Sequence, residues 1–403
     1  MRAGEYNRPV RLALFLAGRL IRRRGTALLR TSAAAALAAV ALGVAALVVV
    51  LALMAGYSSA LRAGILAGGG HLVALYPGGV DAGETAEARE KLAAVSGVTG
   101  VDDVVYLPGM LFPRDSQAAQ VITVKAAGAL PPFAAFAPWD GRGPLPVAVG
   151  AGLARRLAAA PGDVLSLQIV AGGGLPRSLP VVVARVYHTG FAEVDERWAL
   201  ATLDGLRARA GGIPSNGIEV WLADPDRAEA LRDEVEKACR GRALVASWQQ
   251  NNRNLFAALR WQTLSLAVVL SLVLGVGAFE VASALVVLIT EKRREIGVLL
   301  ALGGQPRLLR TTLMLAGGGL GVVGVLGGVL LGVAIAALLT ALGIPRFPPE
   351  IAAIYMVDRI PLHVLPGHLL AVVALGILEV LLASLLPAHR AASRDPVEVL
   401  RWV

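Results

Sequence analysis

Long uncharged stretches dominate the hydrophobic pattern of this chain. Four of them are residues 33–54, 264–290, 311–342 and 369–386. Only two charged side chains interrupt them, Glu280 in the second and Glu379 in the fourth. About 20 helical residues cross the hydrocarbon core of a bilayer, and the stretches lack the polar stripe of a helix buried in a soluble protein. The pattern therefore predicts four transmembrane helices.

The composition fits a membrane protein with a soluble part. Of the 403 residues, 56% are hydrophobic and 17% charged, whereas a soluble domain carries about 25% charged residues. The single cysteine, Cys239, excludes a disulfide scaffold. Residues 33–54 are too long for the apolar region of a signal peptide, so we expect the first span to be retained as a signal anchor.

The distribution of charge predicts the orientation. The formal net charge is +9. The net charge is +11 over the three segments 1–30, 291–310 and 387–403 taken together. It is zero over residues 58–261 and over residues 343–363. The two intramembrane glutamates account for the difference from +9. Because cytoplasmic segments of membrane proteins are rich in Lys and Arg, we expect both termini in the cytoplasm. This asymmetry also argues against nucleic acid as the partner.

These patterns predict an α-helical membrane protein, with four transmembrane helices and a large α+β periplasmic domain inserted between helices 1 and 2. The expected parts are a cytoplasmic, interfacial N-terminal helix (1–30), transmembrane helix 1 (31–57), the periplasmic domain (58–261), transmembrane helix 2 (262–290), a cytoplasmic segment (291–310), transmembrane helix 3 (311–342), a periplasmic loop (343–367), transmembrane helix 4 (368–387) and a cytoplasmic tail (388–403). The N-terminal stretch places Arg11, Arg19 and Arg22 on one helical face, which also fits a simple charged flank.

The outward domain reads as one or two compact α+β units. Strands are expected at residues 71–76, 119–125, 164–170, 180–186 and 217–222, and helices at residues 85–95, 150–160, 203–210 and 225–240. Asp224 is the expected N-cap of the last helix, with Pro225 at its first position. His71 and His188 are isolated and are interpreted as structural, and Cys239 as a buried hydrophobe or a free thiol.

Motifs of hydrolases and nucleotide-binding proteins are missing from the sequence. There is no H-E-x-x-H, G-x-S-x-G or G-x-x-x-x-G-K-[ST], and no metal-ligand cluster, so we expect no catalytic residue, metal or cofactor on this chain. The match of residues 319–324 to G-x-G-x-x-G lies inside an apolar span and is a false positive. Glycines at four-residue spacing, from Gly317 to Gly332, predict close helix packing, either within the bundle or between two copies.

The segment between spans two and three is the candidate for docking a partner. It reads as a short charged helix, a Leu-rich turn and a Gly-Gly break. The candidate contact residues are Glu291, Lys292, Arg293, Arg294, Glu295, Ile296, Gly297, Leu299, Leu300, Gly303 and Gly304. An apolar side flanked by charges suits a groove on a soluble protein, although a bare connector is equally compatible.

Residues 291–304 (EKRREIGVLLALGG) resemble the coupling segment of four-span ABC permeases with a large periplasmic domain. This superfamily includes the macrolide-exporter, FtsX and lipoprotein-releasing LolC/LolE types. The tail 387–401 is similar to their P-A-x-x-A-…-D-P-x-x-x-L-R ending, with Arg390, Asp395 and Pro396 as candidate contacts. Residues 41–57, 248–259 and 355–361 favour the LolC/LolE branch.

The resemblance implies a permease of the bacterial inner membrane that binds no cofactor itself. ATP and Mg would be bound by a separate cytoplasmic ABC ATPase, which acts through residues 291–304. Two permeases, as a homodimer or a LolC/LolE-like heterodimer, would hold a triacylated lipoprotein between their first and second spans. They would release it to a periplasmic carrier.

Two departures from the family pattern concern further site residues. In the lipoprotein-releasing branch, one permease type recruits the carrier through a protruding periplasmic hook. The corresponding stretch in this chain looks short and is either a reduced hook or a hairpin turn. Its residues are Gly172, Gly173, Gly174, Leu175, Pro176 and Arg177. The family usually has Asn where Glu280 stands. Because Glu280 and Glu379 both lie about 16 Å above the cytoplasmic flank, they are candidates for one shared polar site or for two independently solvated carboxylates.

Three alternatives remain at this point. One is an exporter permease for drugs or other amphiphiles. Another is an FtsX-like mechanotransmitting regulator of a cell-wall hydrolase, although residues 58–261 are large for that branch. An intramembrane protease is disfavoured by the missing motifs.

Overall fold

The computed structural model describes residues 13, 15–18, 27–113, 119–170, 176–344 and 359–393. The chain forms two compact units. The helical unit comprises Met1–Gly56, Ala258–Ile344 and Pro361–Val403. The sheet unit comprises Tyr57–Ala257 and Pro345–Ile360.

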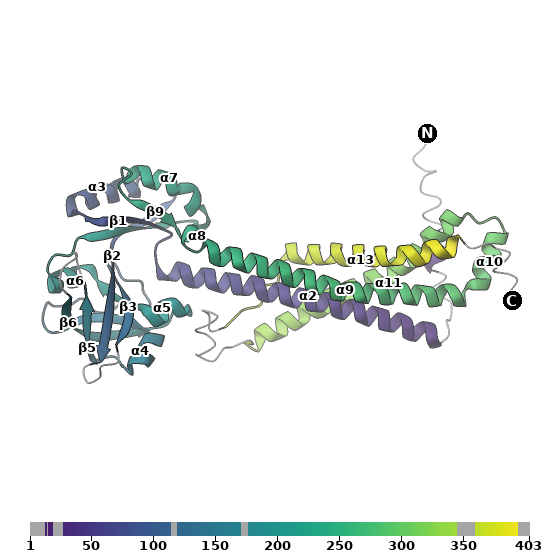
Figure 1. The fold of residues 1–403 in the computed structure, drawn as a ribbon, viewed down its shortest axis with the longest axis horizontal. Helices are drawn as coiled ribbons and strands as arrows, with labels where there is room; N and C mark the ends of the chain where they lie inside the picture. The colour runs from purple at the N-terminus through teal and green to yellow at the C-terminus, as the bar shows by residue number, and fades with distance from the viewer. Residues whose placement is uncertain are drawn as a thin grey trace. The chain divides into compact units, whose positions relative to one another are not determined.

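Among the described residues, four long apolar helices coincide with the predicted spans (Figure 1). They are α2 (Ala27–Gly68), α9 (Arg253–Glu291), α11 (Pro306–Ala341) and α13 (Pro366–Ala392). Each is long and apolar enough to cross a membrane. The first two continue well past the predicted spans, because the Ala- and Leu-rich residues beyond the apolar stretches are also good helix formers. The expected N-terminal interfacial helix falls mostly outside the described residues.

Glycines on α11 let the neighbouring helices of the same chain approach closely. A Cβ on Gly321 would collide with Val380 of α13, and one on Gly328 would lie 2.6 Å from the carbonyl oxygen of Ala41 in α2. In a bilayer, where apolar burial contributes little to helix association, such close backbone contacts hold helices together. The four-residue glycine spacing therefore packs the bundle of this chain.

Within the described residues, nine strands form the sheet of the second unit. They are β1 (Leu72–Val80), β2 (Val98–Pro113), β3 (Gln120–Ala127), β4 (Leu145–Gly150), β5 (Val164–Ile169), β6 (Arg177–Tyr187), β7 (Trp198–Thr202), β8 (Ser215–Leu222) and β9 (Leu244–Ser247). Their order is β3-β7-β4-β6-β5-β2-β8-β1-β9, and β3 also pairs with β2. This additional pairing closes β2 to β7 into a six-stranded ring.

Strand β2 is shared between two lobes. Its first half pairs with β8 and its second half with β3 and β5. The ring encloses an apolar core that includes Leu111, Val147 and Leu167, and we call it the barrel lobe. Strands β1, β8 and β9 pack on α3 (Ala82–Ala93) and α7 (Ala228–Ala238) around a second core, which defines the αβ lobe.

The five expected strands of this domain are confirmed as β1, β3, β5, β6 and β8. The expected helices are confirmed as α3, α4 (Ala151–Leu157), α6 (Leu203–Ala210) and α7. Helix α4 ends earlier than predicted because Ala158 adopts a left-handed φ of 49°. The helix expected at 225–240 begins as a 3-10 turn, Pro225–Arg227, in which Asp224 caps the backbone N–H of Asp226 at 3.0 Å.

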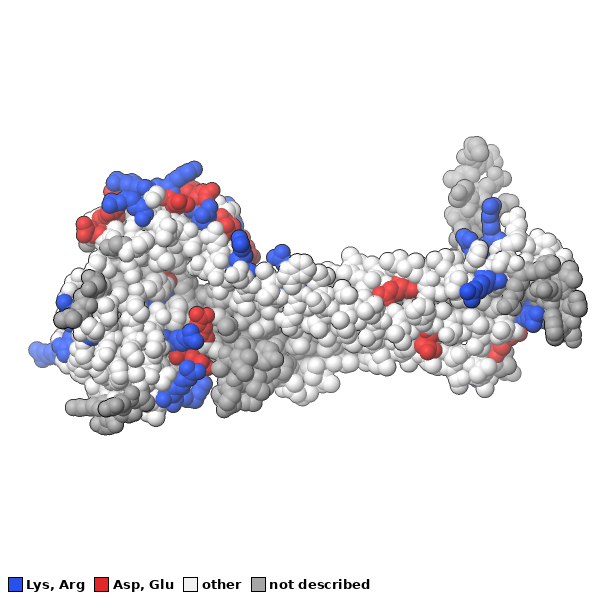
Figure 2. Space-filling model, viewed as in Figure 1, with Lys and Arg blue, Asp and Glu red and all other residues white. Residues whose placement is uncertain are grey.

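The surfaces of the two units differ in polarity (Figure 2). On the face drawn, the helical unit is almost uncharged along the bundle, whereas side chains of both signs are scattered over the sheet unit. An uncharged belt is what a helix bundle in contact with lipid requires.

Candidate functional site

The segment between α9 and α11 is mostly a helix, α10 (Arg293–Ala301), which confirms the short charged helix predicted there. Lys292 interrupts the end of α9, and its ammonium lies 3.0 Å from Oε1 of Glu295, one turn along. The Leu-rich turn expected here is wrong, because Leu299 and Leu300 lie in the last turn of α10. Apolar side chains at helical spacing have continued the helix to Ala301.

One face of α10 is anchored in the helical unit. Ile296 is buried in a cluster with Leu285, Leu309 and Leu313, and Leu300 packs against the same cluster. This contact fixes α10 on the ends of α9 and α11. Any force on α10 therefore reaches two membrane-length helices.

The opposite face of α10 carries an exposed ridge that combines a charge with two apolar side chains. Arg294 is exposed, Val298 is 47% exposed and Leu302 is 84% exposed. Spacings of four residues place these three side chains on one side of the helix. Contiguous exposed apolar groups can mark a surface that docks a protein partner, with charged groups at its rim.

The predicted Gly-Gly break ends this segment. Gly303 has a φ of 86°, a conformation that side chains other than Gly rarely adopt. The carbonyl oxygen of Leu299 accepts a hydrogen bond from the N–H of Gly304 at 3.0 Å. A Cβ on Gly304 would lie only 2.6 Å from the same oxygen. The chain then enters α11 at Pro306, a favoured first helical residue. The two glycines thus hold α10 at a tight turn.

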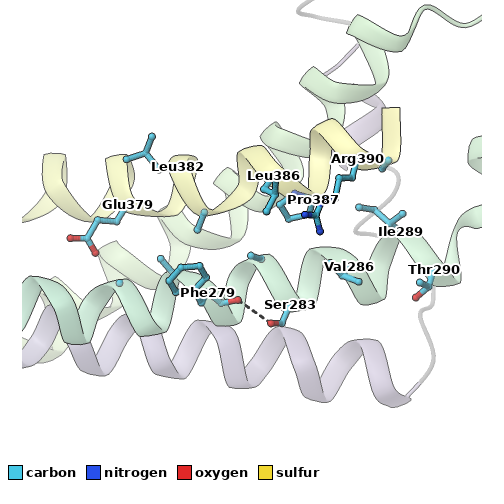
Figure 3. A pocket seen from close by; sticks show the side chains of 15 residues that line it. Phe279, Ser283, Val286, Ile289, Thr290, Glu379, Leu382, Leu386, Pro387 and Arg390 are labelled. Carbon is cyan, nitrogen blue, oxygen red and sulfur yellow. Dashed lines mark hydrogen bonds between the residues drawn. The ribbon is translucent and has the colours of Figure 1, made fainter. Parts of the chain in front are cut away.

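A groove of about 610 Å³ lies between α9 and α13 in the helical unit (Figure 3). Its walls are mostly apolar, with Phe279 from α9 and Leu382 from α13. Ser283 also lines it and donates a hydrogen bond to the carbonyl oxygen of Phe279 at 3.0 Å. Arg390 and Glu379 supply its charged groups.

The two intramembrane glutamates occupy different surroundings. Glu379 lines the groove, and its Oε2 is buried without a hydrogen-bond partner among the described residues. Glu280 is exposed and does not belong to the groove lining, although it follows Phe279 directly. Within the described residues, the groove is therefore lined by Glu379 and, three turns further along α13, by Arg390, but not by Glu280. The shared polar site stays a prediction.

The remaining predicted residues lie in or next to gaps in the described chain. Asp395 and Pro396 of the tail, and Gly172, Gly173, Gly174 and Leu175 of the hook stretch, lie outside the described residues. Arg177 begins β6 opposite Ile169 of β5, and its guanidinium donates to the carbonyl oxygen of Ala210. The hook stretch therefore connects two paired antiparallel strands.

The isolated histidines and the cysteine have structural contacts. Nδ1 of His71 accepts the N–H of Leu222 at 2.9 Å, and Nδ1 of His188 lies 2.9 Å from Oδ2 of Asp195. Cys239 is a buried free thiol, and burial raises its pKa, so the thiol stays protonated. No cluster of His, Cys, Asp or Glu that would hold a metal occurs among the described residues.

One polar cluster consists of residues that the sequence pattern does not single out. Lys125 of β3 and Glu219 of β8 form an ion pair inside the sheet unit, and Tyr106 of β2 donates a hydrogen bond to Glu219. The available signal was a single charge in each of two otherwise uncharged strands.

Two families match this chain. Residues 33–238, half of the chain, match the MacB-like periplasmic core domain, and residues 267–396 match the FtsX-like permease C-terminal family. These two matches cover most of the sheet unit and most of the helical unit.

Several similar proteins come from the lipoprotein-releasing system. Its transmembrane protein LolC from Neisseria meningitidis is 28% identical over 91% of this chain and 93% of the relative. LolC from Xylella fastidiosa is 27% identical over 57% of each chain, so this chain spans about half the length of that relative. LolE from Haemophilus influenzae is 27% identical over 62% of this chain and 63% of the relative. The chain therefore belongs to the FtsX-like permeases with a MacB-like periplasmic core domain, and among them to the LolC/LolE type.

Proposed function

We propose that this chain is the permease subunit of an ABC transporter that extracts lipoproteins from the inner membrane and releases them towards a periplasmic carrier. The similarity to LolC over 91% of the chain supports this proposal, because those relatives are named for lipoprotein release. The four membrane-length helices and the separate sheet unit supply the parts that such a permease needs.

The energy would come from a separate ABC ATPase that binds ATP and Mg and docks on α10. The observation that carries this proposal is the two-sided character of α10. Ile296 anchors one face in the bundle, while Val298 and Leu302 are exposed on the other. Closure of the ATPase against the exposed ridge would push on α9 and α11 through the anchored face.

This function requires α10 in the cytoplasm and the sheet unit in the periplasm, between the first and second spans. The net charge of +11 on residues 1–30, 291–310 and 387–403 supports that orientation. A second permease, identical or LolE-like, would complete the complex. Asp395 and Pro396 of the tail, the stretch 172–177 and the pair Glu280 and Glu379 are proposed as secondary contacts of the ATPase, the carrier and the transport path.

The test uses the purified complex of this permease with its ATPase in lipid nanodiscs. We measure ATP-dependent release of a triacylated lipoprotein to a soluble carrier, and the ATP hydrolysis that the lipoprotein stimulates. The double variant Val298→Asp/Leu302→Asp places two charges on the exposed ridge, where they must be desolvated at an interface. We expect it to lose ATPase co-purification and release by about tenfold or more.

The control variant is Val121→Asp, which adds the same charge at an exposed apolar position of β3 in the sheet unit. It should retain ATPase binding and release. Stimulation of ATP hydrolysis by amphiphilic drugs, without lipoprotein release, would contradict the proposal in favour of an exporter. Normal ATPase binding by the double variant would remove α10 as the docking element.

A further inference from the structure

A buried charged cluster lies where α2 ends inside the sheet unit. Lys125 is 3% exposed and Glu219 is fully buried. The Lys125 ammonium donates a hydrogen bond to Oε1 of Glu219 at 2.8 Å and lies 2.8 Å from Oε2. Tyr106 donates a hydrogen bond to the same Oε1, and burial, followed by the charge of Glu219, raises the pKa of its phenol. The phenol therefore remains a donor over the physiological pH range.

The second hydrogen bond of the Lys125 ammonium goes to the helix. Nζ donates to the carbonyl oxygen of Gly68, the last residue of α2, at 3.0 Å. The final carbonyl groups of a helix have no partner within the helix and carry its partial negative charge. A buried ammonium is a strong ligand for that charge. Lys125 therefore caps α2 from the sheet.

The cluster takes one residue from each of three strands. Lys125 lies on β3 of the barrel lobe, Glu219 on β8 of the αβ lobe, and Tyr106 on β2, the strand that both lobes share. The end of α2 is thus bonded to the junction of the lobes, and not to one of them alone.

Packing around the last turns of α2 strengthens the same connection. A Cβ on Gly64 would lie 2.5 Å from Cβ of Phe191, next to the barrel lobe. On the other side, the Arg62 guanidinium lies 2.7 Å from Asp226 and 5.4 Å from the ring centroid of Trp248, both of the αβ lobe. The final turns of α2 therefore contact both lobes.

Stability alone does not explain why this cluster is charged. A buried ion pair must repay the desolvation of both ions, and well-packed apolar residues of similar volume often stabilise a protein as much or more. What apolar residues cannot do is bind the carbonyl oxygen of Gly68. The charged cluster therefore provides a directional hydrogen bond between the helix and the sheet, which apolar residues could not form.

We propose that Lys125, Glu219 and Tyr106 are positioning residues that lock the end of α2 to the junction of the two lobes, so that movement of the first span is delivered to both lobes together. This inference rests on the proposed transport function. The three side chains determine how much of each ATP-driven movement arrives in the sheet unit.

The test replaces all three side chains by apolar ones of similar size, in Lys125→Met/Glu219→Leu/Tyr106→Phe. This variant leaves no buried ion without its partner, so the sheet unit should still fold, with an unfolding temperature close to that of the wild type. In the full complex in nanodiscs we measure lipoprotein release per ATP hydrolysed. We expect a fall of about tenfold, the factor that corresponds to one charge-assisted hydrogen bond.

Two further variants complete the design. Lys125→Arg keeps the charge and its donors and should retain release per ATP hydrolysed. The control Glu84→Gln/Arg242→Gln removes an exposed ion pair of the αβ lobe, 2.6 Å long, and should change nothing. An unchanged release per ATP hydrolysed in the triple variant overturns the proposal. So does a parallel loss of release and ATP hydrolysis, because that result indicates a purely structural role.

A distance measurement separates this proposal from the proposed function. Spin labels at the exposed positions Ala67 of α2 and Ala208 of α6 measure the distance between the helix and the barrel lobe. Labels at the exposed positions Arg155 of α4 and Ala208 measure a distance within the barrel lobe alone. We expect the triple variant to broaden the first distance distribution and to leave the second unchanged. If the wild-type complex releases no lipoprotein, the proposed function is wrong. The distance distribution between α2 and the barrel lobe still tests whether Lys125, Glu219 and Tyr106 hold the end of α2. If both distance distributions are unchanged in the triple variant, the proposed role of these three residues is contradicted.

Discussion

At the scale of single residues, the sheet unit contains a titratable side chain whose charge state its fold controls. Burial lowers the pKa of His71, and the nearby Arg62 acts in the same direction. Nδ1 of His71 accepts the N–H of Leu222, a bond that protonation of this nitrogen would break. The unfolded chain, in which the pKa is about 6.5, therefore takes up the proton first. The contribution of His71 to stability is present above that pH and is lost as pH falls through the folded pKa.

We therefore expect the unfolding temperature of the sheet unit to fall on acidification from about pH 7.5 to about pH 5, and His71→Gln to reduce that fall. Glutamine keeps an acceptor for Leu222 and does not titrate. The measurement is thermal unfolding of the purified full chain in detergent, followed by circular dichroism at each pH. Equal falls in the wild type and the variant would show that His71 does not titrate on unfolding.

At the scale of elements, α11 is expected to tolerate a methyl group on one face and to reject it on another. A Cβ on Gly321 collides with Val380, whereas one on Gly327 meets nothing within 4 Å. Gly321→Ala should lower the free energy of unfolding by about 1–3 kcal/mol through overpacking. Gly327→Ala on the same helix should be neutral or stabilising by up to about 1 kcal/mol, because Ala favours the helix. Unfolding of both variants in detergent micelles measures the difference, and equal effects would contradict the packing described.

The elements also show what the sequence could and could not predict. The spans were predictable because uninterrupted apolar runs have one common explanation. Strand β2 was missed because Gly100, Pro108 and the pair Asp102 and Asp103 break its apolar alternation, which tertiary pairing on both edges overrides. Strand β9, Leu244–Ser247, is too short to carry a pattern.

The candidate site was predictable only in part. The charged and apolar residues of α10 are contiguous in the chain, so their pattern could be recognised. The cluster of Lys125 and Glu219 could not, because its members are separated by 94 positions and only the pairing of β2 with β3 and β8 brings them together. Single charges in apolar strands mark such residues without identifying their partners.

At the scale of the whole molecule, the proposed function requires that α10 and the sheet unit face opposite sides of the membrane. A permease that is driven by an ATPase on one side and acts on a lipoprotein carrier on the other must expose these two parts to different compartments. If both parts faced one compartment, neither the exposed ridge of α10 nor the buried charged cluster at the end of α2 would serve transport.

The most direct measurement labels single cysteines in intact spheroplasts with a membrane-impermeant maleimide. Arg155→Cys lies on α4 of the sheet unit and Arg294→Cys on α10, and both positions are exposed, whereas the native Cys239 is buried. We predict that the variant at 155 reacts in intact spheroplasts and that the variant at 294 reacts only after permeabilisation. Equal reaction of both variants before permeabilisation would contradict the account.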